Sequence, residues 1–319
     1  MTSHSSAPTA RFDPLTPKLT TNGIKMPYFT TSDGVDLYYE DTGSGTAIIF
    51  VHEFSGDYRS WEHQVRYFCR RYRCITCNAR GYPPSEVPGD VEMYSQARAV
   101  ADIAETLDHL GIDKAHCVGL SMGGFAAMHF GLDYADRARS VVIGGVGFGA
   151  APDTADKFRD EVEAVAKRWE KEGPETFAPV YGRGPGREQL ETKDPRGFAE
   201  FIEQLQQHSG RGAANTLRGV QMRRPSPWDL RERLAEMTVP ALILHGDEDR
   251  PALPTGVLLK QTIPTAGLVV LPKTGHTANL EEPAAFNAAV QDFIATVDAG
   301  RWTRRDKRTE SDAILLEKK

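Results

Sequence analysis

Short apolar runs alternate with longer amphipathic segments over most of the chain, a pattern typical of strands alternating with helices. The helical period is clearest over 94–110, where apolar residues recur three and four positions apart. We expect strands at 28–30, 35–39, 47–51, 73–78, 141–145, 240–244 and 268–271, and in the run that ends at Gly119. The alternation predicts an α/β fold with a mostly parallel central sheet flanked by helices.

The alternation stops between residues 148 and 224, where the pattern is helical and polar. Helices are expected there at 154–171, 174–180, 195–208 and 213–222, with a loop at 182–187. A helical block inserted at the ligand-bearing edge of a sheet predicts a cap over the site. The expected organisation is a flexible segment 1–25, a core formed by 26–147 and 225–298, a helical cap 148–224 and a C-terminal tail 299–319.

Composition narrows the class of protein. The 319 residues carry a net charge of −6 with both signs interspersed, and no basic patch indicates nucleic-acid binding. No apolar run approaches the roughly 20 residues that span a bilayer, and the N-terminus lacks an apolar signal region. We therefore expect a cytoplasmic protein with a small-molecule substrate and neither nucleic-acid nor membrane partners; a homodimer stays open.

A metal or redox site is the alternative raised by Cys74 and Cys77, which are three positions apart. Side chains at that spacing in a strand point to opposite faces, and a second pair of ligands is lacking. We expect these cysteines to be core residues, and we expect neither a metal nor a cofactor.

The strongest chemical signal is the sequence Gly119-Leu-Ser121-Met-Gly123, which lies between an apolar run and a helix-forming run. A sharp strand-to-helix turn lifts the serine hydroxyl above the sheet and leaves no room for Cβ atoms at the two glycines. The first N–H groups of the following helix then point toward the serine. The pattern predicts a nucleophile at Ser121 and one oxyanion donor at the N–H of Met122.

A base and an acid follow in the required order. The strand at 240–244 ends in a loop that carries two candidate acids, Asp247 and Asp249, and the strand at 268–271 leads to His276. Loops beyond the carboxyl ends of parallel strands share one edge of the sheet. The spacing therefore predicts that a nucleophile, an acid and a base meet there.

These segments resemble the α/β-hydrolase family in Val-Gly-Leu-Ser-Met-Gly-Gly, Leu-His-Gly-Asp-Glu-Asp and Thr-Gly-His-x-x-x-Leu-Glu-Glu-Pro. The resemblance covers about residues 28–297 and implies a triad of Ser121, Asp249 and His276. It places the acid on the last residue of Gly-Asp-Glu-Asp, which favours Asp249 over Asp247. The family's usual His-Gly-x-Pro after the third strand implies a second oxyanion donor at the N–H of Phe54.

The chain departs from that family pattern at Glu53, which replaces the glycine, and at Ser55, which replaces the proline. A carboxylate facing the site would oppose developing negative charge unless it were protonated or paired. Glu53 is therefore a candidate proton donor or substrate contact. The alternative is that it points away and binds loop backbone or an arginine. Tyr82, in a loop near the site, is a second candidate substrate contact.

The resemblance implies hydrolysis of a carboxylic ester or lactone through an acyl-enzyme, with enol-lactone hydrolases and esterases sharing the serine motif. Two alternatives remain: a hydrolase of carbon–carbon bonds in ring-cleavage products, and a non-catalytic small-molecule receptor. One cap arginine could pair with a substrate carboxylate, although most are expected on solvated surface. The candidates are Arg183, Arg187, Arg211 and Arg218.

Overall fold

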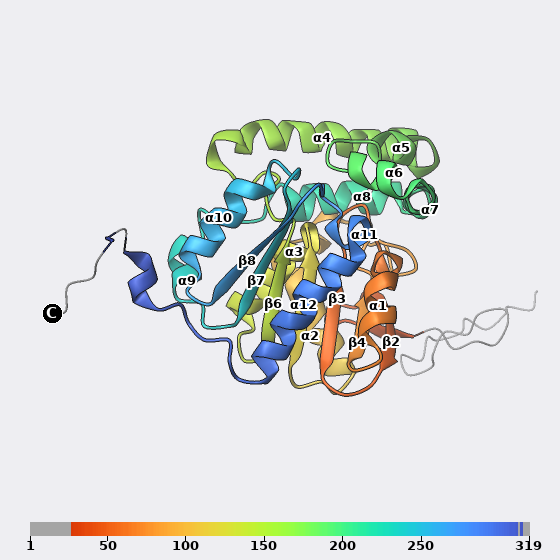
Figure 1. The fold of residues 1–319 in the computed structure, drawn as a ribbon. Coiled ribbons are helices and arrows are strands. Elements are labelled where there is room, and N and C mark those ends of the chain that lie inside the picture. Colours follow the sequence, from red (N-terminus) through yellow and green to blue (C-terminus); the bar gives the residue numbers. More distant parts are fainter. Residues whose placement is uncertain (1–26, 312, 315–319) are drawn as a thin grey trace, which may run out of the picture.

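The computed structural model describes residues 27–311, 313 and 314, and these form a mostly parallel eight-stranded sheet flanked by helices (Figure 1). The strands are β1 (Tyr28–Thr30), β2 (Asp36–Gly43), β3 (Ala47–Val51), β4 (Arg73–Cys77), β5 (Ala115–Leu120), β6 (Ala138–Gly144), β7 (Ala241–Gly246) and β8 (Ala266–Leu271). Their order across the sheet is β1-β2-β4-β3-β5-β6-β7-β8. Strand β2 is antiparallel to β1 and β4, and the other pairs are parallel. The predicted fold class is confirmed.

Both faces of the sheet are covered by apolar side chains from helices. The helices on one face are α2 (Gln96–His109), α3 (Met122–Asp133), α9 (Arg231–Ala235) and α10 (Ala252–Thr262). Helices α1 (Glu62–Phe68) and α12 (Pro283–Asp298) pack on the other face. Cys77 belongs to the first apolar cluster and Cys74 to the second, as expected for residues three apart in a strand.

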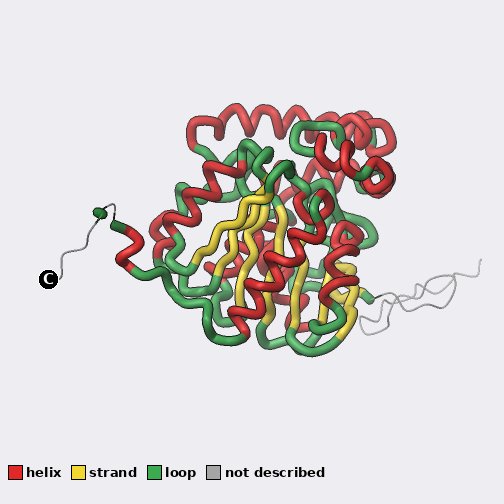
Figure 2. Tube along the Cα trace, in the orientation of Figure 1, coloured by secondary structure: helices red, strands yellow, loops and turns green. Residues whose placement is uncertain are grey.

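Residues 148–224 form helices that lie beyond the carboxyl edge of the parallel strands (Figures 1 and 2). They are α4 (Ala155–Glu172), α5 (Pro174–Tyr181), α6 (Glu188–Lys193), α7 (Pro195–Leu205) and α8 (Gly210–Thr216), followed by a π-helical turn at Leu217–Gln221. Their apolar side chains form one cluster with Phe54, Tyr82 and Met122 of the core. The segment therefore packs directly on the residues predicted to surround the nucleophile.

Two helices, α6 and α10, occur where the sequence pattern indicated none. Pro254 and Gly256 weaken the helical signal of α10, although a proline in the first turn removes no helical hydrogen bond. Tertiary packing stabilises α10: a Cβ on Gly256 would lie 2.5 Å from the His245 ring, so the helix packs closely on β7. The sequence pattern over 228–237 is also helical, but the structure forms only the short helix α9 within it.

The start of the expected C-terminal tail is attached to the core. Trp302 packs edge-on against Phe293 at 4.6 Å, and its Nε1 donates to the Thr265 carbonyl at 2.7 Å. Arg305 donates to the carbonyls of Lys260 and Gln261. The expected flexible segment 1–25 lies outside the described residues.

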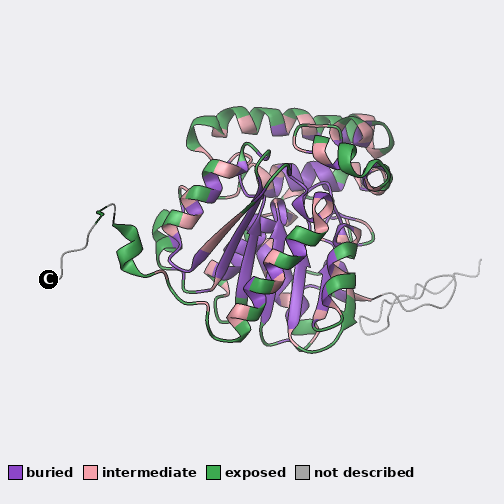
Figure 3. Cartoon of the chain, viewed as in Figure 1, coloured by how far each residue is buried: buried purple, intermediate pink, exposed green. Residues whose placement is uncertain are grey.

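Burial is highest along the central strands, while the flanking helices expose one face (Figure 3). Strands β3, β5 and β7 are buried along their whole length, as expected for parallel strands covered on both faces. Within the part of the chain that the structure describes, every helix is too short or too polar to cross a bilayer.

Candidate active site

Ser121 occupies a strained turn between β5 and α3, with φ 53° and ψ −114°. Glycine is required on both sides of it: a Cβ on Gly119 would lie 2.0 Å from the Gly123 carbonyl oxygen, and one on Gly123 would lie 2.0 Å from the Val51 carbonyl oxygen. Non-glycine residues adopt such backbone conformations only where the surrounding fold holds them in place, and those that do are concentrated at functional sites. The turn leaves Ser121 partly exposed among buried neighbours.

The two predicted oxyanion residues, Met122 and Phe54, belong to one apolar cluster, and Met122 directly follows Ser121. Met122 begins α3, so its N–H belongs to the first helical turn, where intrahelical acceptors are lacking. Phe54 is buried in the loop after β3, and its carbonyl accepts a hydrogen bond from the Tyr82 hydroxyl at 3.0 Å. Tyr82 is 1% exposed and also packs edge-on against His52. Its hydroxyl supports the Phe54 loop, and its predicted substrate contact stays a prediction.

His276 is bound to Asp249 in a buried pair. The Nδ1 of His276 lies 2.7 Å from Oδ2 of Asp249, and both residues are buried. Asp247, the other candidate acid, is exposed and accepts the backbone N–H of Thr274. Burial alone would lower the pKa of His276, but the charge and hydrogen bond of Asp249, with a contribution from Glu53, raise it above its ordinary value.

Gly145, just beyond β6, lies between the nucleophile and the base. A Cβ on Gly145 would be 3.4 Å from His276 Cε1 and 3.4 Å from the Ser121 backbone nitrogen. The His276 ring and the Ser121 backbone would therefore both be in van der Waals contact with the same atom, so the two residues are close in space. Phe148 makes an edge-on contact with the imidazole, with ring centroids 5.3 Å apart at 83°. The residues predicted as nucleophile, base and acid are thus gathered at one edge of the sheet.

Glu53 is buried and paired with an arginine of the helical segment. Nη2 of Arg187 lies 2.9 Å from Glu53 Oε2, 3.2 Å from Oε1 and 2.8 Å from the Ser55 hydroxyl. Burial alone would raise the pKa of Glu53, but the positive charges of Arg187 and His276 lower it below its ordinary value. Of the alternatives drawn from sequence, pairing with an arginine is what the structure shows, and an ionised carboxylate argues against a proton donor.

The other three candidate arginines, Arg183, Arg211 and Arg218, lie outside this contact. Arg218 pairs with Glu163 and Glu170, and Arg183 is exposed.

Two hydrogen-bonded supports of His276 were not predicted from the sequence. The Glu281 carboxylate accepts the backbone N–H groups of Gly275 and Thr277, which flank His276. The backbone N–H of His276 donates to the Gly186 carbonyl at 2.7 Å. Leu-Glu-Glu-Pro after the histidine was the available signal for the first support. The second depends on a contact between segments 90 residues apart in the chain, which no local pattern reveals.

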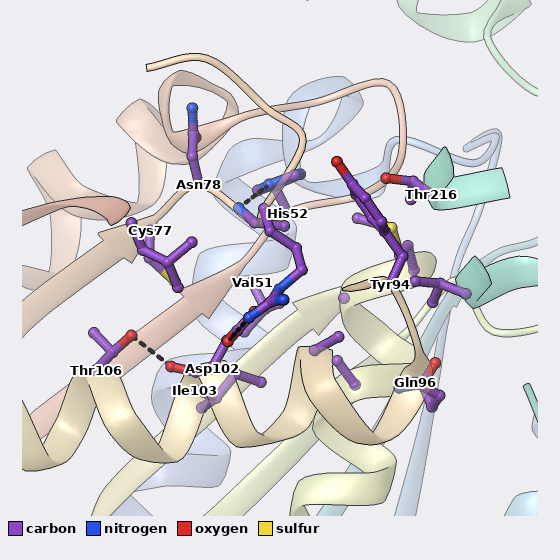
Figure 4. Close-up of a pocket in the computed structure, with 18 of the residues that line it drawn as sticks. Val51, His52, Cys77, Asn78, Tyr94, Gln96, Asp102, Ile103, Thr106 and Thr216 are labelled. Atoms are coloured by element: carbon purple, nitrogen blue, oxygen red, sulfur yellow. Dashed lines mark hydrogen bonds and ion pairs between the residues drawn. The ribbon is translucent and has the colours of Figure 1, made fainter. Parts of the chain in front are cut away.

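A separate cavity of about 40 Å³ lies between the carboxyl ends of β3 and β4 and one side of α2 (Figure 4). Ser121 and His276 do not line it; Met122, Gly123 and Thr216 do. A volume of this order holds one or two water molecules. The cavity therefore has no room for a substrate.

Comparison with known proteins agrees with the geometry. Residues 46–283 match the family model described as alpha/beta hydrolase fold. The chain is 30% identical to 2-hydroxy-6-oxo-6-phenylhexa-2,4-dienoate hydrolase of Burkholderia cepacia, over 81% of this chain and 91% of that protein. It is 28% identical to 3-oxoadipate enol-lactonase 1 of Acinetobacter baylyi, over 84% and 96%.

A solved structure is also similar: a thermophilic esterase from Thermogutta terrifontis superposes with a TM-score of 0.74 at 27% identity, covering 86% of this chain and 98% of that one. The family model spans more than half of the chain and includes the segments that carry Ser121, Asp249 and His276. The chain belongs to the alpha/beta hydrolase fold family.

Proposed function

We propose that this protein is a serine hydrolase that cleaves a carboxylic ester or lactone of a small molecule. The observation that carries the proposal is the buried 2.7 Å contact of His276 with Asp249, next to a serine held in a strained strand-to-helix turn. A base oriented by an acid beside an exposed nucleophile is the arrangement that activates a hydroxyl.

In the proposed reaction, the Ser121 Oγ attacks the carbonyl carbon while Nε2 of His276 takes its proton. Asp249 accepts a hydrogen bond from the Nδ1–H of His276 and stabilises the imidazolium that forms. The N–H groups of Met122 and Phe54 hold the oxyanion. Collapse of the tetrahedral intermediate breaks the C–O bond, and the leaving alkoxide takes the proton from His276. Water then attacks the acyl-enzyme by the same steps, releasing the acid and Ser121.

The aromatic side chains packed around Phe54 and His276 favour an apolar substrate. The Phe54 ring contacts the rings of Tyr181 and Trp169, with centroids 5.6 and 6.3 Å apart. Phe148 contacts the imidazole edge-on. Aromatic walls with a few polar groups are typical of small-molecule sites. We therefore expect short aromatic or alkyl esters to be turned over.

The test is hydrolysis of a p-nitrophenyl ester by wild type and by Ser121→Ala, together with labelling by a fluorophosphonate probe. We expect turnover and labelling in wild type and loss of both in the variant. A wild type that neither hydrolyses esters nor reacts with the probe would refute a serine hydrolase and favour a receptor.

A second candidate is hydrolysis of a carbon–carbon bond, favoured by the 30% identity to the dienoate hydrolase. A panel of esters, lactones and ring-cleavage diketones separates the two activities. Higher kcat/KM on a diketone than on every ester and lactone would favour the second candidate.

A further inference from the structure

Glu53 and Arg187 join two loops that are 134 residues apart in the chain. Glu53 directly precedes Phe54, whose N–H is the proposed second oxyanion donor, so its carboxylate belongs to the oxyanion loop. One Arg187 nitrogen, Nη2, contacts both Glu53 oxygens and the Ser55 hydroxyl. The pair is buried, at 4% exposure for Glu53 and 7% for Arg187. The contact therefore fastens the 182–187 loop to the oxyanion loop away from solvent.

The residue before Arg187 contacts the base. The Gly186 carbonyl accepts the backbone N–H of His276 at 2.7 Å. The approach is close: a Cβ on Gly186 would lie 3.1 Å from the His276 Cβ, and one on Gly275 would lie 2.4 Å from the Gly186 carbonyl oxygen. Consequently a shift of the 182–187 loop would move the backbone that carries the imidazole.

We propose that Arg187 is a positioning residue of the active site: its ion pair with Glu53 clamps the 182–187 loop and thereby fixes His276 relative to the oxyanion loop. The inference rests on the proposed role of His276 as the base. Glu53 is the second member of this clamp. Since both charges are buried, each is costly to leave alone, which makes the paired arrangement strongly preferred.

Several charges face the imidazole, and Glu53 and Arg187 act on it in opposite senses. Glu53 raises the pKa of His276, and Arg187 lowers it. The charged and titratable groups around His276 are Asp249 after β7, Glu53 after β3, Arg187 before α6, His245 in β7 and Glu281 at the end of the short helix α11 (Ala278–Glu281). Removing either Glu53 or Arg187 therefore changes both the position of His276 and the net charge beside it. Removing both leaves that net charge nearly unchanged, so the double variant isolates the effect of the lost position.

The experiment compares Arg187→Met, Glu53→Gln and the double variant with wild type, by pH–rate profiles on a p-nitrophenyl ester. We expect kcat to fall about 10²-fold in all three, with KM within threefold, because misplacement by about 1 Å costs that much. The acid limb of the profile, where activity is lost as pH falls, follows the pKa of His276. It should move to higher pH by about one unit in Arg187→Met and to lower pH by about one unit in Glu53→Gln. In the double variant it should return to the wild-type position while kcat stays low.

Two further variants serve as controls. Arg183→Met changes an exposed arginine of the same loop and should leave kcat and the acid limb unchanged. Arg187→Lys keeps the charge and one donor to Glu53, and should restore kcat to within tenfold of wild type. If Arg187→Met does not fold, Arg187→Lys and Glu53→Gln carry the comparison.

Failure of the clamp and failure of the proposed function can be told apart. The pKa of the His276 imidazole is followed by NMR titration, which needs no turnover. A wild type that shows neither ester turnover nor probe labelling refutes the function, and the clamp still stands if the titration shows the opposite shifts. If Arg187→Met is folded with an unchanged His276 pKa and unchanged kcat, the pair has only a structural role and the proposal is overturned.

Discussion

Replacing Asp249 with Asn removes the negative charge that stabilises the His276 imidazolium while keeping the size of the side chain. Asp249 is 1% exposed and His276 is 4% exposed, so solvent screens the pair weakly. At an effective dielectric constant of about 20, opposite charges about 4 Å apart attract by about 4 kcal/mol. If this attraction is lost in the transition state, kcat falls about 10³-fold, since each 1.36 kcal/mol corresponds to about tenfold. An amide can also donate to Nδ1 and select the wrong tautomer, which lowers kcat further.

The assay is kcat and kcat/KM on a p-nitrophenyl ester between about pH 5 and pH 9. In the proposed mechanism only the neutral imidazole can accept the serine proton, so activity should fall as pH drops through the raised pKa of His276. Asp249→Asn should move this acid limb to lower pH. The matched control is Asp247→Asn, on the same loop but exposed, which should stay within twofold of wild type. An Asp249→Asn variant within tenfold of wild type, or with an unmoved acid limb, would refute the reasoning.

Three further predictions concern stability. Gly123→Ala should unfold the protein or cost more than about 3 kcal/mol, because its Cβ would lie 2.0 Å from the Val51 carbonyl oxygen; denaturant titration measures this. Trp302→Ala should cost about 2 kcal/mol in the same titration through lost packing on Phe293, and no loss would mean that the segment is not attached. Because the pKa of Glu53 is lowered on folding, its contribution to stability is present above its ordinary pKa of 4.5 and is lost as pH falls through the lowered value. The stability difference between wild type and Glu53→Gln should therefore shrink on acidification, and a constant difference would contradict the pairing.

The fold class could be predicted because it depends on local, repeated signals. Alternating apolar runs and helical periods predicted the sheet, and Gly119 and Gly123 predicted the turn around Ser121, since both express short-range sterics. Helix α10 escaped prediction because Pro254 and Gly256 weaken its local signal, and its stability comes from packing on β7. The start of the expected tail likewise depends on a distant contact, that of Trp302 with the Thr265 carbonyl.

The site divides in the same way. By itself, the sequence determined the residue types and chain order of Ser121, Asp249 and His276, and it marked Glu53 as a departure that needed a protonated or paired carboxylate. Only the tertiary structure decided which partner Glu53 has, and it brought Arg187 to it from a loop 134 residues away. It also seated the Gly186 carbonyl on the backbone of His276. The physical reason is that a buried charge selects its partner by proximity in the folded chain, where desolvation makes pairing necessary, and proximity across such a distance is set by the packing of whole elements.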